Sequence, residues 1–94
     1  MANKIKLKPG QTVALKLTLD EREFLLENLS FGDETVRLML EGSQEIQLTL
    51  KELANLGRSV AEAFRNTKDR KVGKKLDRMS HRIEGLLELF EEGQ

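Results

Sequence analysis

The stretch that decides the fold runs from Val72 to Phe90 and reads VGKKLDRMSHRIEGLLELF. Apolar residues recur along it at steps of 4, 3, 4, 3 and 4, at Val72, Leu76, Met79, Ile83, Leu86 and Phe90. Such spacing returns to the same side of an α-helix at every turn. The stretch therefore predicts a long amphipathic helix over about residues 68–91, with one face buried.

A second helix is predicted directly upstream, over residues 50–65, with Leu53, Leu56, Val60 and Phe64 facing inward. Only the short polar segment 66–69 separates the two helices, and helices joined by so short a link pack as an antiparallel hairpin. Gly57 lies in the interior of the second helix, where glycine costs about 1 kcal/mol relative to alanine. We expect that it permits a close helix crossing.

Two corners between a strand and a helix are built alike. The segments Leu17–Glu21 (LTLDE) and Leu48–Glu52 (LTLKE) match at an offset of 31 residues, and each holds Thr and Glu at capping-box spacing. Before each corner, apolar and polar residues alternate, which is typical of a strand with one buried face. We expect strands at residues 12–17 and 46–48 that pair side by side, followed by helices that begin near residues 19 and 50.

Several boundaries are less defined by the pattern. Residues 4–8 also alternate, and Pro9-Gly10 can form a turn, so this segment is either the first strand of a hairpin or a loose arm. The helix from residue 19 is expected to end by about residue 30, closed by Gly32. Residues 33–41 are compatible with a strand or a short helix. Helix is favoured, because Asp33 is a good cap and Gly42-Ser43 a good stop.

These elements predict a single α+β domain over residues 1–94. It consists of a small antiparallel sheet of two or three short strands packed against helices, with a long C-terminal helical hairpin. The residues expected in its core are Val13, Leu15, Leu17, Leu25, Leu29, Leu48, Leu53, Val60, Phe64, Leu76, Met79, Ile83, Leu86 and Phe90.

The amino-acid composition limits the partners and the cellular location that we expect for this protein. The 94 residues include 16 cations, 16 anions and no Cys. The zero net charge indicates no strongly charged partner, and the lack of Cys suits a reducing cytoplasm. No apolar run approaches the roughly 18 residues that span a bilayer, and no apolar segment follows the N-terminal Met. We expect a cytoplasmic protein without a membrane partner.

Catalytic and metal-binding motifs are missing from the sequence. His81, the single histidine, falls on the side of its helix opposite the apolar residues, so we expect a surface side chain. No nucleophile elbow or phosphate-binding loop occurs. The paired carboxylates at positions 20–21, 33–34 and 91–92 are explained by helix starts and a tail. The sequence predicts neither an enzyme nor a cofactor, metal or small-molecule substrate.

Charge is divided unevenly along the C-terminal hairpin. Residues 65–82 hold eight cations and two anions, a net charge of +6, whereas residues 83–94 hold four anions and no cation, a net charge of −4. Cations at the start of a helix and anions at its end oppose the macrodipole, at about 0.3–1 kcal/mol each. Helix stability alone therefore does not explain this order.

Four of these cations, Lys71, Lys75, Arg78 and Arg82, form one stripe beside the apolar face. Three interpretations stay open: a solvated surface, a protein surface and a nucleic-acid surface. Acidic residues of the first helix, Glu21, Glu23 and Glu27, or a second copy of the chain in an antiparallel pair, would match the stripe.

The preferred prediction is a non-enzymatic interaction module that forms a homodimer or docks a protein partner through its last helix. The four cations would steer this contact, and an exposed Leu87 or Leu89 would anchor it. The alternative is nucleic-acid binding by the basic residues in 68–82. The zero net charge, the absence of Tyr and Trp, and the four Phe, which mostly fall on apolar faces, argue against that alternative.

The segments 48–53, 66–71 and 74–78 together resemble a family of small uncharacterised bacterial proteins. The resemblance covers about residues 46–90. It implies a strand followed by a C-terminal two-helix hairpin, in a bacterial cytoplasm, and it implies no chemistry.

Overall fold

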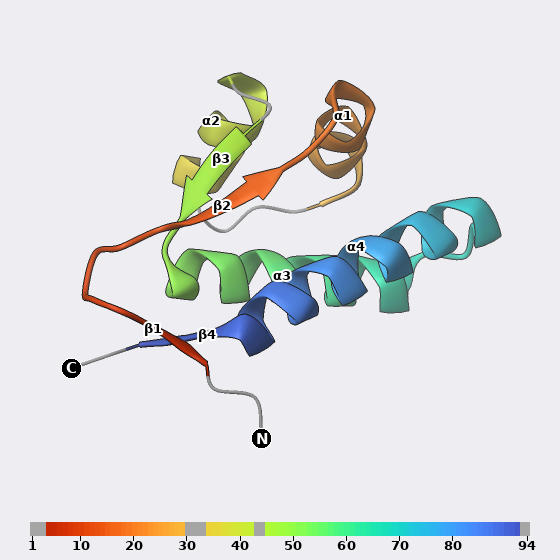
Figure 1. Cartoon of the computed structure of the whole chain (residues 1–94). Helices are drawn as coiled ribbons and strands as arrows, with labels where there is room; N and C mark the ends of the chain where they lie inside the picture. The colour runs from red at the N-terminus through yellow and green to blue at the C-terminus, as the bar shows by residue number, and fades with distance from the viewer. Residues whose placement is uncertain (1–3, 30–33, 43–44, 93–94) are drawn as a thin grey trace.

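The computed structural model describes residues 4–29, 34–42 and 45–92. These residues form a mixed α+β structure with a C-terminal helical hairpin, which confirms the predicted fold class (Figure 1). In chain order the elements are β1 (Ile5–Leu7), β2 (Val13–Lys16), α1 (Leu19–Asn28), α2 (Glu34–Gly42), β3 (Glu45–Leu48), α3 (Leu50–Asn66), α4 (Arg70–Leu89) and β4 (Phe90–Glu92).

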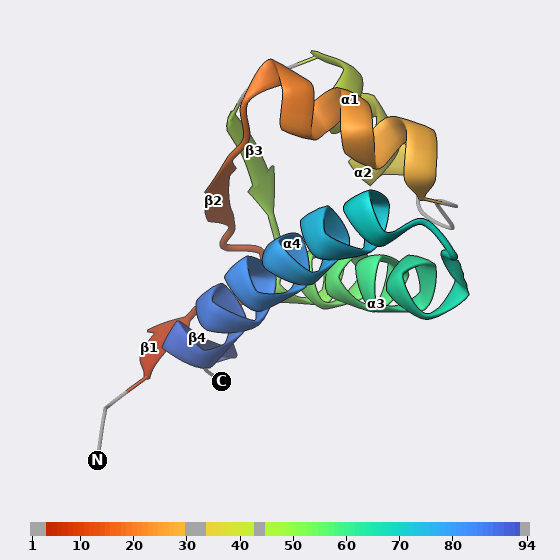
Figure 2. The ribbon, with the colours of Figure 1, turned by 90° about the vertical axis from the view of Figure 1, so that its right-hand side faces the viewer.

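The elements form two layers. The antiparallel helices α3 and α4 form one layer, and the β2–β3 pair with α1 and α2 lies over one side of it (Figure 2). Strands β2 and β3 pair antiparallel, from Val13 opposite Leu48 to Lys16 opposite Glu45, as their similar corners predict. The buried side chains of both strands point toward the helical layer, so the core lies between the two layers.

Both predicted capping boxes are present. The Thr18 hydroxyl accepts from the Glu21 amide at 3.1 Å, and the Glu21 carboxylate accepts from the Thr18 amide at 2.9 Å. Thr49 and Glu52 repeat the arrangement at 3.2 and 2.9 Å. Each box satisfies amides at the first turn of a helix and fixes where the strand stops. Helix α1 ends at Asn28, and Gly32, its predicted closing residue, lies outside the described residues.

The N-terminal strand differs from the prediction. A strand does form at β1, but the predicted hairpin with residues 12–17 is wrong, because β1 pairs in parallel with β4, with Ile5 opposite Phe90. The turn after β1 is present, with Gly10 at φ +85° and the Gln11 amide bonded to the Lys8 carbonyl. It leads the chain from the end of α4 to the other layer. The sequence predicts a single antiparallel sheet. The structure instead has two separate pairs of strands, and the β1–β4 pair is parallel.

The same pairing explains where α4 ends. The helix stops at Leu89, two residues before the predicted boundary, and Phe90 is extended at φ −123° and ψ 151°. From Phe90 onward the backbone pairs with β1 instead of continuing the helical ladder. This pairing between the two ends of the chain leaves no local pattern in the sequence.

The sequence of residues 33–41 is compatible with a strand or a short helix, and the structure confirms a helix, α2, over Glu34–Gly42. Helix α2 buries Val36 and Leu40, four residues apart, whereas Leu38 is 59% exposed. Burial at a spacing of four is typical of a helix and not of a strand. The predicted cap Asp33 and the predicted stop residue Ser43 lie outside the described residues.

Most of the predicted core is buried, with three exceptions. Phe64 is 44% exposed, and Leu86 and Phe90 are partly buried. Phe64 lies at the last turns of α3, where its neighbours are the small residues Thr67 and Gly73, which leave its ring uncovered. Further apolar residues that join the buried set are Leu7, Val36, Leu40, Ile46 and Leu56.

Arg22 lies on the apolar side of α1 and is the charged residue that is buried among the described residues. It is 8% exposed, and its Nη1 donates to the Leu40 carbonyl oxygen at 3.2 Å. Leu40 lies in the last turn of α2, where helix carbonyls lack partners and the macrodipole favours a cation. Arg22 therefore ties α1 to the C-terminal end of α2.

Gly57 lies at a close approach of α3 and α4, as predicted. A Cβ atom built at Gly57 would lie 3.0 Å from Ile83 Cγ2 and 4.0 Å from Leu87 Cδ1. Ile83 is 1% exposed, and its branched side chain is stiff in a helix, so it cannot easily move aside. The absence of a side chain at Gly57 thus lets the two helices approach.

We expect Gly57→Ala and Gly85→Ala to have opposite effects on stability. At Gly85 an added Cβ meets nothing within 4 Å, so the better helix propensity of alanine should raise the free energy of unfolding by about 0.5–1 kcal/mol. At Gly57 the overlap with Ile83 should outweigh that gain and leave a net loss of about 1 kcal/mol. Urea unfolding measures both, and equal effects at the two positions would contradict the close crossing.

Candidate functional site

Helix α4 carries the residues that the sequence singled out for binding. Its apolar side is buried through Leu76, Met79 and Ile83. The stripe of Lys71, Lys75, Arg78 and Arg82 follows one flank of that buried side.

Arg82 already has partners within the chain. Its Nη1 lies 2.8 Å from Glu21 Oε2 in α1, and its Nη2 donates to the Lys16 carbonyl oxygen at the end of β2. The Arg82 and Glu21 side chains are 43% and 32% exposed, so solvent screens this ion pair in part. Arg82 thus holds α4 against the corner between β2 and α1.

Lys75 also faces α1. Its Nζ lies 5.3 Å from the centre of the Phe24 ring, within the range of a cation–π contact. Two of the four cations of the stripe, Lys75 and Arg82, therefore contact α1, which was one of the partners predicted for the stripe. Neither is fully available to a partner.

Lys71 and Arg78 are exposed and form no ion pair with another described residue. The two predicted anchors differ from each other. Leu89 is 55% exposed, as expected, whereas Leu87 is partly buried against the core and lies close to Gly57, so its predicted exposure is wrong. The sequence places Leu87 beside the apolar side of the helix but does not show that α3 covers it.

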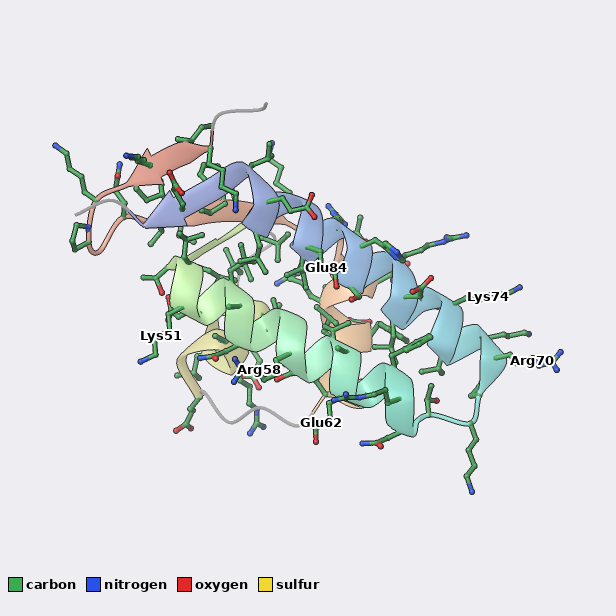
Figure 3. All side chains as sticks on the ribbon, turned by 90° about the horizontal axis from the view of Figure 1, so that it is seen from below. Lys51, Arg58, Glu62, Arg70, Lys74 and Glu84 are labelled. Atoms are coloured by element: carbon green, nitrogen blue, oxygen red, sulfur yellow. The ribbon has the colours of Figure 1, made fainter. Side chains whose placement is uncertain are left out.

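A second row of exposed residues runs along the side of α4 that points away from the core. We call this row the outer face; its members recur at steps of 4, 4, 3, 4 and 3, and they are Arg70, Lys74, Arg78, His81, Gly85 and Glu88. Figure 3 shows Arg70 and Lys74 near the hairpin turn. Glu88, the last member of the row, lies in the final turn of α4. The row therefore begins with cations and ends with a carboxylate.

Sequence reasoning missed this row, although its spacing could have revealed it. The stripe was chosen for its four cations, whereas the outer face mixes both signs of charge with His81 and Gly85. The four-residue and three-residue steps mark it as one side of the helix. Because this side is opposite the buried one, it is the part of α4 that a partner can reach most readily.

His81 lies at the middle of the outer face. Its side chain is 72% exposed, which confirms the expected surface position. Nδ1 lies 2.8 Å from the Asp77 carbonyl oxygen and 3.5 Å from Asp77 Oδ1. Over residues 4–29, 34–42 and 45–92, no three His, Asp or Glu side chains are grouped to hold a metal ion.

No protein-family model, curated protein or solved structure matches the chain. Within the described ranges, none of the helices combines the length and the apolar character needed to cross a membrane. The surfaces of the chain itself are therefore the basis for inferring its function.

We expect Arg82 and Glu21 to stabilise the fold together. Arg82→Ala should cost more than Glu21→Gln, because Arg82 also donates to the Lys16 carbonyl, and the amide oxygen introduced by Glu21→Gln can still complete the capping box. The double variant should show a coupling of about 0.2–1 kcal/mol that decreases at high salt. Urea unfolding of the wild type, the two single variants and the double variant measures it. Strictly additive effects would show that the contact does not stabilise the fold.

Proposed function

We propose that this protein is a non-enzymatic interaction module that forms a homodimer through the outer face of α4. One observation carries the proposal. Among the described residues, the cations at one end of the outer face form no ion pair with Glu88 at the other end, because both ends lie on one helix. A second copy that runs antiparallel supplies the opposite charge at both ends.

The geometry of such a pair is simple. If the two-fold axis passes beside His81, residues equally far from His81 in the two copies face each other. Lys74 precedes His81 by seven residues and Glu88 follows it by seven, so each Lys74 faces Glu88 of the second copy. Both side chains are exposed, and symmetry makes this contact twice.

Gly85 supports a close approach at this face. It is exposed in the interior of α4, where glycine costs about 1 kcal/mol relative to alanine, and an added Cβ would meet nothing within 4 Å. Unlike Gly57, it therefore packs against no other element among the described residues. Next to a second α4, the missing side chain leaves room for the helix opposite.

The pair also accounts for the order of charges along α4. Cations near the start of the helix and carboxylates near its end oppose its macrodipole. An antiparallel partner places carboxylates beside the cations and cations beside the carboxylates. This order of charges opposes the macrodipole within one copy, but it allows attractive contacts between two antiparallel copies.

The expected dimer is weak and sensitive to salt. Exposed ion pairs contribute only about 0.2–1 kcal/mol each, and salt screens them. Leu89, at the edge of the outer face, adds apolar area.

The proposal includes no catalysis and no cofactor. The bacterial and cytoplasmic setting stays a prediction, which agrees with the absence of Cys from the sequence.

We expect a charge exchange at Lys74 and Glu88 to break and then restore the dimer. Lys74→Glu or Glu88→Lys alone turns two attractive contacts into repulsive ones and should weaken association about 5- to 30-fold. The double variant K74E/E88K restores opposite charges between copies and should recover association. Sedimentation velocity at low salt over a series of concentrations measures the dissociation constants of the wild type, the two single variants and the double variant.

Lys51→Glu is the matched control, because Lys51 is exposed on α3 and lies off the outer face. It makes the same change in charge and should leave association unchanged. A double variant that associates no better than the single variants would contradict the antiparallel arrangement. A wild-type protein that stays monomeric would contradict the proposed function itself.

A further inference from the structure

Phe64 is an aromatic residue whose surroundings differ from the prediction. The sequence predicts it in the core, yet it is 44% exposed at the turn between α3 and α4. One edge of its ring faces Gly73 of α4, where an added Cβ would lie 3.9 Å from Phe64 Cε2. The helix therefore supports the ring on one side and leaves another part of it open to solvent.

A hollow of about 420 Å³ lies beside this ring. Phe64, Thr67 and Gly73 form its apolar part, and Lys68, Arg70 and Lys74 line it as well. These three cations make no ion pair with any residue in the described part of the chain. The hollow thus combines a flat apolar surface with unpaired positive charge.

The two carboxylates at the hollow have other contacts. Asp69 is the N-cap of α4 and accepts from the Lys71 and Val72 amides at 2.9 and 3.3 Å. Asp77 lies 3.5 Å from Nδ1 of His81. Residues 64–78 contain seven cations and two anions, so the turn carries a net charge of +5 although the whole chain is neutral. This local charge favours an anionic ligand.

An exposed aromatic ring next to cations is the arrangement by which proteins hold unpaired bases. Bases stack on the ring, and the cations bind the phosphates on either side. A duplex hides the faces of its bases and cannot use the ring. We propose that this hollow binds single-stranded nucleic acid, with one base stacked on Phe64 and the adjoining phosphates held by Lys68 and Arg70.

This site differs from the basic stripe that the sequence indicated. Lys75 and Arg82 of the stripe are directed at α1, whereas Lys68 and Arg70 are free of such contacts among the described residues. The absence of Tyr and Trp no longer argues against nucleic acid, because Phe64 supplies the stacking surface. The site is also separate from the proposed dimer contact, apart from Arg70 and Lys74, which belong to the outer face and line the hollow as well.

Fluorescence anisotropy with a labelled oligothymidylate of about 15 nucleotides tests the proposal. We expect binding at about 20 mM salt that weakens as salt rises, with a slope of about −0.7 for each phosphate contacted. Phe64→Leu keeps an apolar side chain but removes the ring, and it should lower the affinity about 5- to 150-fold. Phe64→Tyr should retain most of it. The double variant K68E/R70E should lower the affinity for every strand tested.

Three results would overturn the proposal. They are the absence of binding at low salt, equal affinity for an abasic strand of the same length, and equal affinity for a duplex of the same sequence. Circular dichroism of Phe64→Leu confirms that the variant is folded, as its half-exposed position predicts. The sedimentation of Phe64→Leu should match that of the wild type, because Phe64 lies off the outer face. The experiments can therefore contradict the proposed base-binding site without contradicting the proposed dimer, and the reverse.

Discussion

Ile83 of α4 lies against the backbone of Gly57 in α3, and the positions of the other elements depend on this contact. It lets the two long helices pack closely as one layer, and the β2–β3 pair with α1 and α2 lies over one side of that layer (Figure 2). Arg82 and Lys75 then join α4 to α1 from the flank. One side of α4 is used by the fold in this way, and the opposite side is left exposed over most of its length.

The sequence predicts the parts of this fold that depend on local patterns. The apolar spacing of α4 predicts its buried side, and the two capping boxes locate the ends of β2 and β3 and therefore their pairing. The β1–β4 pair could not be predicted, because it joins Ile5 to Phe90 across the whole chain and has no turn to mark it. The exposure of Phe64 was equally hidden, since it follows from the absence of a side chain at Gly73, a residue of the next helix.

The candidate sites were also only partly predictable from the sequence, because they depend on contacts between elements that are distant along the chain. The sequence reveals that positive charge precedes negative charge along α4, but it cannot show which cations the fold itself uses. Arg82 and Lys75 belong to one stripe with Lys71 and Arg78, yet among the described residues α1 makes an ion pair or ring contact with only the first two. The charges that remain lie on the outer face and around the hairpin turn, where the two proposed surfaces are found.

An antiparallel pair of α4 helices that cross at His81 is the central claim, and a cysteine placed there tests it most directly. The chain contains no Cys, so His81→Cys provides a single thiol on the proposed two-fold axis. Arg58→Cys provides a matched thiol at an exposed position on α3. Under mild oxidation at low salt, we expect rapid formation of a covalent dimer by His81→Cys and little by Arg58→Cys. Equal rates of cross-linking in the two variants would contradict the proposed pair.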